Sequence, residues 1–161
     1  MTHHIIFEPK KILLHFAADR IPGMTPEEFM PCSVIGFADL RDGLMAVAIF
    51  NNYRLHKGVG IDAQMTFVAC TPRWATRGNI RAVFTYAFHQ LRLPRLTCIT
   101  AKGNKRARKL CEGMGFTREG THPRGVDGVQ TAISYGLLPE NCHWLKGEPR
   151  EQIESLASAR A

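Results

Sequence analysis

The stretch from Met65 to Phe116 constrains the fold most, because apolar strand-like runs alternate in it with helical patterns. The apolar run Met65–Cys70 has the length of a buried strand, and apolar residues then recur at helical spacing from Arg77 to Leu91. A second strand pattern, Leu96–Thr100, and a second helix pattern, Lys105–Gly113, follow. A strand, a helix and another strand in this order predict two parallel strands joined by a right-handed crossover.

The turn between the first strand and the first helix, Thr71–Asn79, predicts an anion site. Backbone N–H groups in the first turn of a helix have no partner within the helix, so they can hold a phosphate-sized group. Arg73 and Arg77 add positive charge to this turn.

The residues before this stretch predict a helix and three consecutive antiparallel strands. Pro9–Arg20 has apolar residues on one helical face, and His3 and His4 before it are interpreted as a frayed terminus. Val34–Leu40 and Leu44–Phe50 flank an Asp-Gly turn and predict a hairpin, followed by a loop and a third strand, Ile61–Cys70.

The residues after it predict two further strands, Phe116–His122 and Ala132–Leu138, joined by the Gly- and Pro-containing loop Pro123–Gly128. We expect one domain over residues 1–146, since no linker divides the chain. Residues 147–161 are polar and rich in Ala and Ser, which indicates a C-terminal tail or a weak helix.

From residue 34 to 138 the chain resembles the GNAT family of acetyl-CoA-dependent N-acetyltransferases, closest to the branch that acetylates ribosomal proteins and protein N-termini. The residues that carry the resemblance are Asn104, Ala107, Gly115, Phe116, Glu119 and Gly120. It implies an α/β fold with a mixed, mostly antiparallel sheet, a central parallel strand pair splayed around the cofactor, and flanking helices.

The pyrophosphate loop of this family, Arg/Gln-x-x-Gly-x-Gly/Ala, is matched less closely. Aligning Arg77 with the first position puts Ile80 where the first Gly belongs, although Ala82 fits the last position. A second register would place the loop on Arg73–Thr76. Both registers keep the anion site in the same turn.

By this resemblance, backbone groups of the first strand would pair with the pantetheine arm, the turn would bind the pyrophosphate, and the start of the second helix would contact pantetheine or substrate. The implied cofactor-binding residues are Phe67, Val68, Cys70, Arg73, Trp74, Ala75, Thr76, Arg77, Gly78, Asn79, Asn104, Ala107 and Arg108.

Acetyl transfer also needs an acid for the departing thiolate. Many family members have a Tyr four residues before the Gly-Phe pair, where this chain has Cys111, and the Ser that serves other members is Ala107 here. Cys111 is therefore one catalytic candidate, although it could also be a small residue that packs on a helix face. Asn104 is the other, by the resemblance. Ser134 and Tyr135 are further candidate acids. The candidate bases Asp62, Glu119 and His122 stay open.

A net charge of +7 and a pI near 9.5 favour an anionic partner. Much of the excess lies within Lys102–Lys109, near the predicted cofactor end, so a coenzyme A thioester accounts for it better than nucleic acid does. The 5 cysteines follow no disulfide or zinc pattern, which predicts no metal and a reducing cytoplasm. No apolar run reaches the length of a membrane span.

The leading hypothesis is an acetyl-CoA-dependent N-acetyltransferase that transfers acetyl directly to a primary amine, on a protein N-terminus, a lysine or a small amine. Two alternatives remain: a related transferase that modifies nucleic-acid bases, and a non-catalytic binding module of the same fold. A monomer and a homodimer are both compatible with the sequence.

Overall fold

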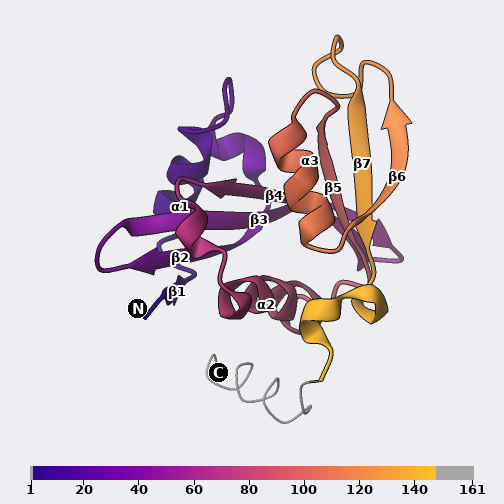
Figure 1. The fold of residues 1–161 in the computed structure, drawn as a ribbon. Coiled ribbons are helices and arrows are strands. Elements are labelled where there is room, and N and C mark those ends of the chain that lie inside the picture. The colour runs from indigo at the N-terminus through magenta and orange to yellow at the C-terminus, as the bar shows by residue number, and fades with distance from the viewer. Residues whose placement is uncertain (1, 148–161) are drawn as a thin grey trace.

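The structure is a computed structural model and describes residues 2–147, so the predicted tail lies outside the described residues apart from Gly147. Within this range the strands form one mixed sheet in the order β1-β2-β3-β4-β5-β7-β6 (Figure 1). The strands are β1 His4–Ile6, β2 Ser33–Asp39, β3 Gly43–His56, β4 Val59–Ala69, β5 Leu96–Ala101, β6 Thr117–His122 and β7 Ala132–Leu137. The predicted α/β fold with a mostly antiparallel sheet is confirmed.

Helices and short helical turns connect these strands. They are α1 Lys10–Ala18, η1 Pro26–Phe29, η2 Pro72–Trp74, α2 Arg77–Thr85, η3 Tyr86–Gln90, α3 Lys105–Gly113, η4 Pro139–Asn141 and η5 His143–Leu145. The predicted central helix is divided: α2 is α-helical, and η3 continues it as a π-helical turn. Apolar spacing alone does not distinguish these two helical forms.

Two predictions at the edges of the sheet were wrong. His4 belongs to the short edge strand β1, which pairs with β2, so the terminus is tied down instead of frayed. The loop expected before Ile61 is instead a continuation of the β3–β4 hairpin, which turns at Lys57 and Gly58 with φ of 50° and 79°. The glycines Gly58 and Gly60 are typical of a loop, although Val59 and Ile61 alternate with them as in a strand.

The two faces of the sheet are covered differently. One face carries the larger core, in which Phe50, Phe84 and Tyr135 are fully buried between the sheet, α2 and α3. On the other face α1 and η1 pack over β2 and β3, with Leu13 and Phe29 in the smaller core. The helices on this second face stop short of β5 and β7.

The parallel pair at the centre of the sheet is very short. β4 and β5 pair only at Ala63 with Leu96 and at Gln64 with Thr97. Beyond these residues the two strands diverge, and Figure 1 shows β1–β4 and β5–β7 running in clearly different directions. We call this divergence the fork of the sheet. The predicted splayed parallel pair is therefore confirmed.

Within residues 2–147, no helix is both long enough and apolar enough to cross a membrane.

Candidate active site

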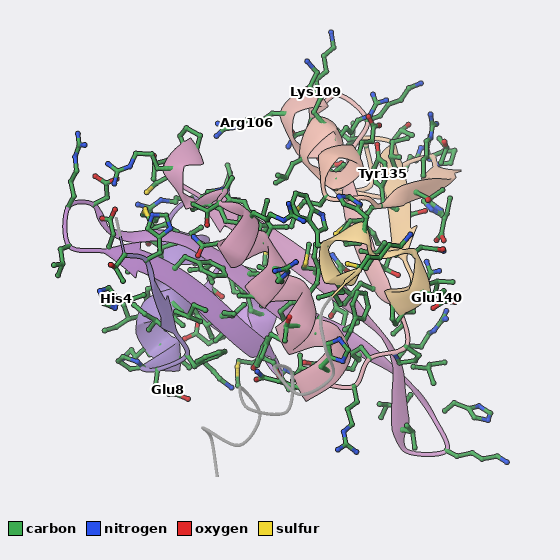
Figure 2. All side chains as sticks on the ribbon, turned by 60° about the horizontal axis from the view of Figure 1, so that its bottom comes forward. His4, Glu8, Arg106, Lys109, Tyr135 and Glu140 are labelled. Carbon is green, nitrogen blue, oxygen red and sulfur yellow. The ribbon has the colours of Figure 1, made fainter. Side chains whose placement is uncertain are left out.

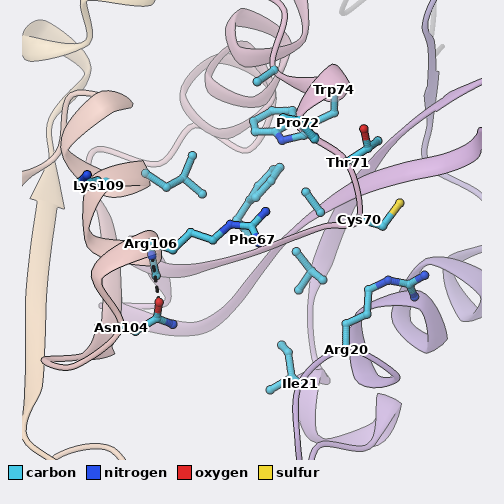
Figure 3. A pocket seen from close by; sticks show the side chains of 15 residues that line it. Arg20, Ile21, Phe67, Cys70, Thr71, Pro72, Trp74, Asn104, Arg106 and Lys109 are labelled. Atoms are coloured by element: carbon cyan, nitrogen blue, oxygen red, sulfur yellow. Dashed lines mark hydrogen bonds between the residues drawn. The ribbon is translucent and has the colours of Figure 1, made fainter.

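A cleft of about 760 Å³ opens into the fork from the carboxyl ends of β4 and β5. It lies between the end of β4, the turn that follows it, the start of α3 and the residues after α1 (Figure 3). The lining residues are Arg20, Ile21, Phe67, Val68, Ala69, Cys70, Thr71, Pro72, Trp74, Ala75, Asn104, Arg106, Ala107, Lys109 and Leu110. Seven of the residues implied by the resemblance are among them.

Trp74 anchors the β4 side of the cleft. Its indole is 3% exposed and packs on Phe67, with ring centroids 4.2 Å apart, and on Phe37, with centroids 6.0 Å apart. These contacts connect the turn after β4 to two strands of the sheet. The wall that a ligand meets here is consequently rigid and largely apolar.

The turn that leads into α2 is held by its own side chains. Thr76 Oγ1 accepts a hydrogen bond from Asn79 N at 3.1 Å, and Asn79 Nδ2 donates to Trp74 O at 2.6 Å. The first helical hydrogen bond is donated by Ile80 N to Thr76 O, so the amides of Arg77 and Gly78 precede it. A Cβ on Gly78 would meet nothing within 4 Å, so this side of the first turn of α2 is open.

Arg73, one of the implied cofactor residues, is placed elsewhere. Its guanidinium forms ion pairs with Asp39 at 2.5 Å and with Asp42 at 2.8 Å, in the turn between β2 and β3. The amides of Asp42 and Arg41 also donate to Asp39, and together with Arg73 they lower the pKa of its carboxyl group. Arg73 therefore joins the β2–β3 turn to η2, and the cleft takes its charge from other residues.

The opposite wall of the cleft is formed by α3. Asn104 Oδ1 accepts a hydrogen bond from Ala107 N at 3.0 Å and caps the helix at the cleft. Arg106 and Lys109 line the cleft, although the sequence analysis did not select them individually. In Figure 3, Arg106 extends from α3 into the cleft, and Arg20 lies on the opposite side. Figure 2 shows Arg106 and Lys109 projecting together from α3.

The family resemblance implied Arg108 as a cofactor-binding residue and neither Arg106 nor Lys109. Arg108 lies on another side of α3. Its Nε donates to Tyr135 Oη at 3.4 Å, and its Nη1 donates to Lys102 O at 3.1 Å. Tyr135 Oη also donates to Glu112 Oε1 at 3.3 Å. Arg108 and Glu112 are one helical turn apart and thus share the face that binds Tyr135. The hydroxyl of Tyr135 is therefore directed to α3 and away from the cleft lining.

Cys111 is not among the lining residues of the cleft. Its thiol interacts with that of Cys98, which lowers the pKa of Cys111, whereas this interaction and burial raise the pKa of Cys98. Cys98 Sγ also donates a hydrogen bond to Met65 O at 3.4 Å. Met65 and Cys98 directly follow Gln64 and Thr97, the last residues of β4 and β5 that pair with each other. The structure thus places the candidate acid next to the point where β4 and β5 separate.

The candidate bases lie on the face of β4, β5, β7 and β6 opposite α2 and α3, which we call the open face. Thr97 Oγ1 donates to both oxygens of Asp62, at 2.8 and 3.0 Å. Arg95 forms ion pairs with Asp62 and Glu119 and crosses Gly136, where a Cβ would overlap Glu119 and Arg95. Two carboxylates share one guanidinium here, and Arg54 on β3 is directly opposite Asp62.

The pairing with Arg95 predicts a pH dependence of stability for Glu119. The hydrogen bond and the positive charge of Arg95 lower the pKa of Glu119 below the ordinary value of about 4.3. The ionised carboxylate therefore stabilises the fold above that pH. The stabilisation is lost as pH falls through the lowered pKa. In urea unfolding, we expect Glu119→Gln to be less stable than the wild type at about pH 7, with a deficit that shrinks as the pH falls through the lowered pKa of Glu119. Glu27→Gln, at an exposed carboxylate, is the control; a pH-independent deficit in Glu119→Gln would contradict the expectation.

Among the described residues, no three His, Cys, Asp or Glu side chains are grouped so that they could hold a metal ion. The site therefore offers thiols, carboxylates, an imidazole and backbone amides as its chemical groups.

Solved structures of acetyltransferases are similar to this chain in fold. Spermidine/spermine N-acetyltransferase SpeG from Vibrio cholerae matches with a TM-score of 0.67 at 14% identity, covering 86% of this chain and 96% of that one. Ribosomal-protein-S5-alanine acetyltransferase from Vibrio fischeri matches with a TM-score of 0.66 at 12% identity, covering 92% and 97%.

A further structure, described as a probable acetyltransferase, matches with a TM-score of 0.60 at 18% identity, covering 86% of this chain and 93% of that one. No protein-family model and no curated protein sequence matches the chain. The strand order, the fork and these similarities agree, and the chain has the GNAT fold.

Proposed function

We propose that the protein is an N-acetyltransferase that moves an acetyl group from acetyl-CoA directly to a primary amine. The observation that carries the proposal is a cationic cleft that leads into the fork. Arg20, Arg106 and Lys109 line it, and no carboxylate is present among its lining residues. A ligand with several phosphates fits this charge, and residues 1–146 would act as one acyltransferase domain.

The walls of the cleft also fit the uncharged part of coenzyme A. From Thr66 to Ala69, β4 has no pairing with β5, so its edge on the fork side faces the cleft. The amides of a pantetheine arm could pair with this edge, as a neighbouring strand would. The amides of Arg77 and Gly78 would hold the pyrophosphate, and Arg106 and Lys109 would bind the outer phosphates.

The open face also offers carboxylates to an amine acceptor. Asp62 on β4 and Glu119 on β6 would attract a cationic acceptor to this side of the fork before it loses its proton. The similar enzymes are described by different acceptors, a polyamine for SpeG and a ribosomal protein alanine for the other. A protein N-terminus, a lysine and a small amine therefore all belong to the proposed acceptor class.

The test is calorimetric titration of acetyl-CoA, followed by an assay of released thiol with spermidine, an alanine-terminated peptide and a lysine peptide. We expect micromolar binding that Asn104→Ala weakens, and turnover with at least one acceptor class. Failure of the folded protein to bind acetyl-CoA would refute the proposal. Binding to DNA with a steep salt dependence and no amine turnover would favour the nucleic-acid alternative.

A further inference from the structure

His122 and Ser134 form a hydrogen-bonded pair on the open face. His122 Nε2 lies 2.8 Å from Ser134 Oγ, between the neighbouring strands β6 and β7. Ile133 and Tyr135, the neighbours of Ser134 on β7, point into the larger core. Because side chains alternate along a strand, Ser134 points to the opposite face. The imidazole is exposed and the hydroxyl is half-buried, so both are accessible from solvent.

The pair lies next to the fork. Ser134 is directly opposite Ile99 on β5, two residues beyond Thr97 in the last parallel pair. Neighbouring strands are about 4.8 Å apart, so Ser134 is one strand spacing from the β5 edge of the fork. Ile99 is 44% exposed, which shows that this row of the sheet is open to an incoming molecule. An amine that reaches the fork from the open face passes this pair.

Two glycines make room for the imidazole. A Cβ on Gly120 would lie 2.9 Å from both His122 Nε2 and Ser134 Oγ, and a Cβ on Gly125 would lie 2.8 Å from His122 Cβ. The pairing of β6 with β7 also shifts register between Arg118 and Gly120. The backbone is thus shaped around the His122–Ser134 contact from both sides, and a larger residue at position 120 would separate the two side chains.

We infer that His122 and Ser134 together accept the proton of the attacking amine; this inference rests on the proposed acyltransferase function. With the proton of the imidazole on Nδ1, Nε2 accepts a hydrogen bond from Ser134 Oγ, and Ser134 is the member of the pair nearer to the fork. The neutral amine nitrogen forms a bond to the thioester carbonyl carbon, and the carbon–sulfur bond breaks. The proton of the amine passes to Ser134 Oγ directly or through one water molecule, the hydroxyl proton passes to His122 Nε2, and the departing thiolate takes a proton from solvent.

Most of the other charged groups around His122 are engaged. On β6, Glu119 is paired with Arg95, and Arg118 Nη2 donates to Thr121 Oγ1. In the turn after β6, the carboxylate of Asp127 accepts bonds from the amides of Val129 and Gln130, which lowers its pKa to about 2. Arg124 is exposed in the same turn. The titratable group of β7 is Tyr135, whose hydroxyl lies on the other face.

The experiment compares kcat and KM from pH 5.5 to 9.5 for the wild type, His122→Gln, Ser134→Ala and Gly120→Ala. We expect His122→Gln to lower kcat by roughly 100-fold or more, because positioned proton transfer contributes about that factor. The kcat of this variant should no longer fall at acidic pH, because that fall reflects the need for a neutral imidazole. Added free imidazole should restore part of the lost rate. The Kd of acetyl-CoA should stay unchanged.

Gly120→Ala keeps both groups but separates them, and Ser134→Ala keeps the imidazole but leaves the transfer to a water molecule, so we expect a loss of about 10-fold in kcat from each, with the acid limb displaced rather than lost. His56→Gln, at an exposed imidazole on the β3–β4 hairpin, is the control and should match the wild type. Turnover in His122→Gln within twofold of the wild type, with the same pH profile, would overturn this inference alone. Absence of turnover in the wild type would overturn it together with the proposed function.

Discussion

Replacing Arg106 and Lys109 together with glutamate is expected to weaken the binding of coenzyme A by about 100-fold or more. Both side chains line the cleft from α3, where they would face phosphate groups. Reversing two charges converts two attractions into two repulsions. At the effective dielectric constant of a protein surface, each close charge pair contributes on the order of 1 kcal/mol or more.

The double variant Lys11→Glu/Lys57→Glu is the matched control, because it changes the net charge equally at exposed residues outside the cleft lining. Calorimetric titration at low and at physiological salt separates local from long-range effects, since distant charges are screened beyond about 8 Å. Equal weakening in both double variants would show that net charge, and not the cleft, attracts the ligand. Unchanged affinity in the Arg106/Lys109 variant would remove the phosphate role from α3.

Trp74→Ala is the second large effect that we expect, and it concerns stability first. The indole is almost fully buried and packs on Phe37 and Phe67, so its removal leaves a cavity between η2 and the sheet. Truncating a buried aromatic residue to alanine costs about 3–5 kcal/mol, which corresponds to a decrease in Tm of roughly 10 °C for a chain of this size.

Leu40→Ala is the control for this truncation, because Leu40 is 98% exposed and its loss should change Tm by less than about 1 °C. Thermal unfolding monitored by circular dichroism measures both variants. Since Trp74 also forms a wall of the cleft, we expect Trp74→Ala to weaken acetyl-CoA binding at a temperature where it is still folded. A Tm equal to that of the wild type would mean that the turn after β4 is held by Thr76 and Asn79 alone.

Local patterns predicted the elements that position the cleft. The strand–helix–strand order of Met65–Thr100 requires a parallel pair, and the structure has one. Phe67, Trp74 and Asn104 line the cleft. Their positions could be predicted, because each residue lies near the end of a predicted strand or at the start of a predicted helix. Residues at the ends of strands and helices are predictable to the extent that the elements themselves are.

Interactions between distant parts of the chain could not be predicted. Arg73 was expected at the anion site from its position in the turn, and its guanidinium is paired with Asp39, 34 residues away. Arg108 was implied by the family resemblance, and it is bound to Tyr135, 27 residues away. Charge in a sequence does not show which cation is neutralised within the fold. The His122–Ser134 contact needed the register of β6 against β7, which no local pattern specifies.

The two residue pairs that join β4 to β5 have a mechanical consequence. They form the joint between two arms of the molecule, β1–β4 and β5–β7, whose internal pairing is antiparallel and extensive. Backbone hydrogen bonds therefore do not fix the distance between the arms beyond the joint. The larger core, which packs residues of both arms against α2, sets the width of the cleft, so substitutions in that core should change ligand affinity without any contact with the ligand.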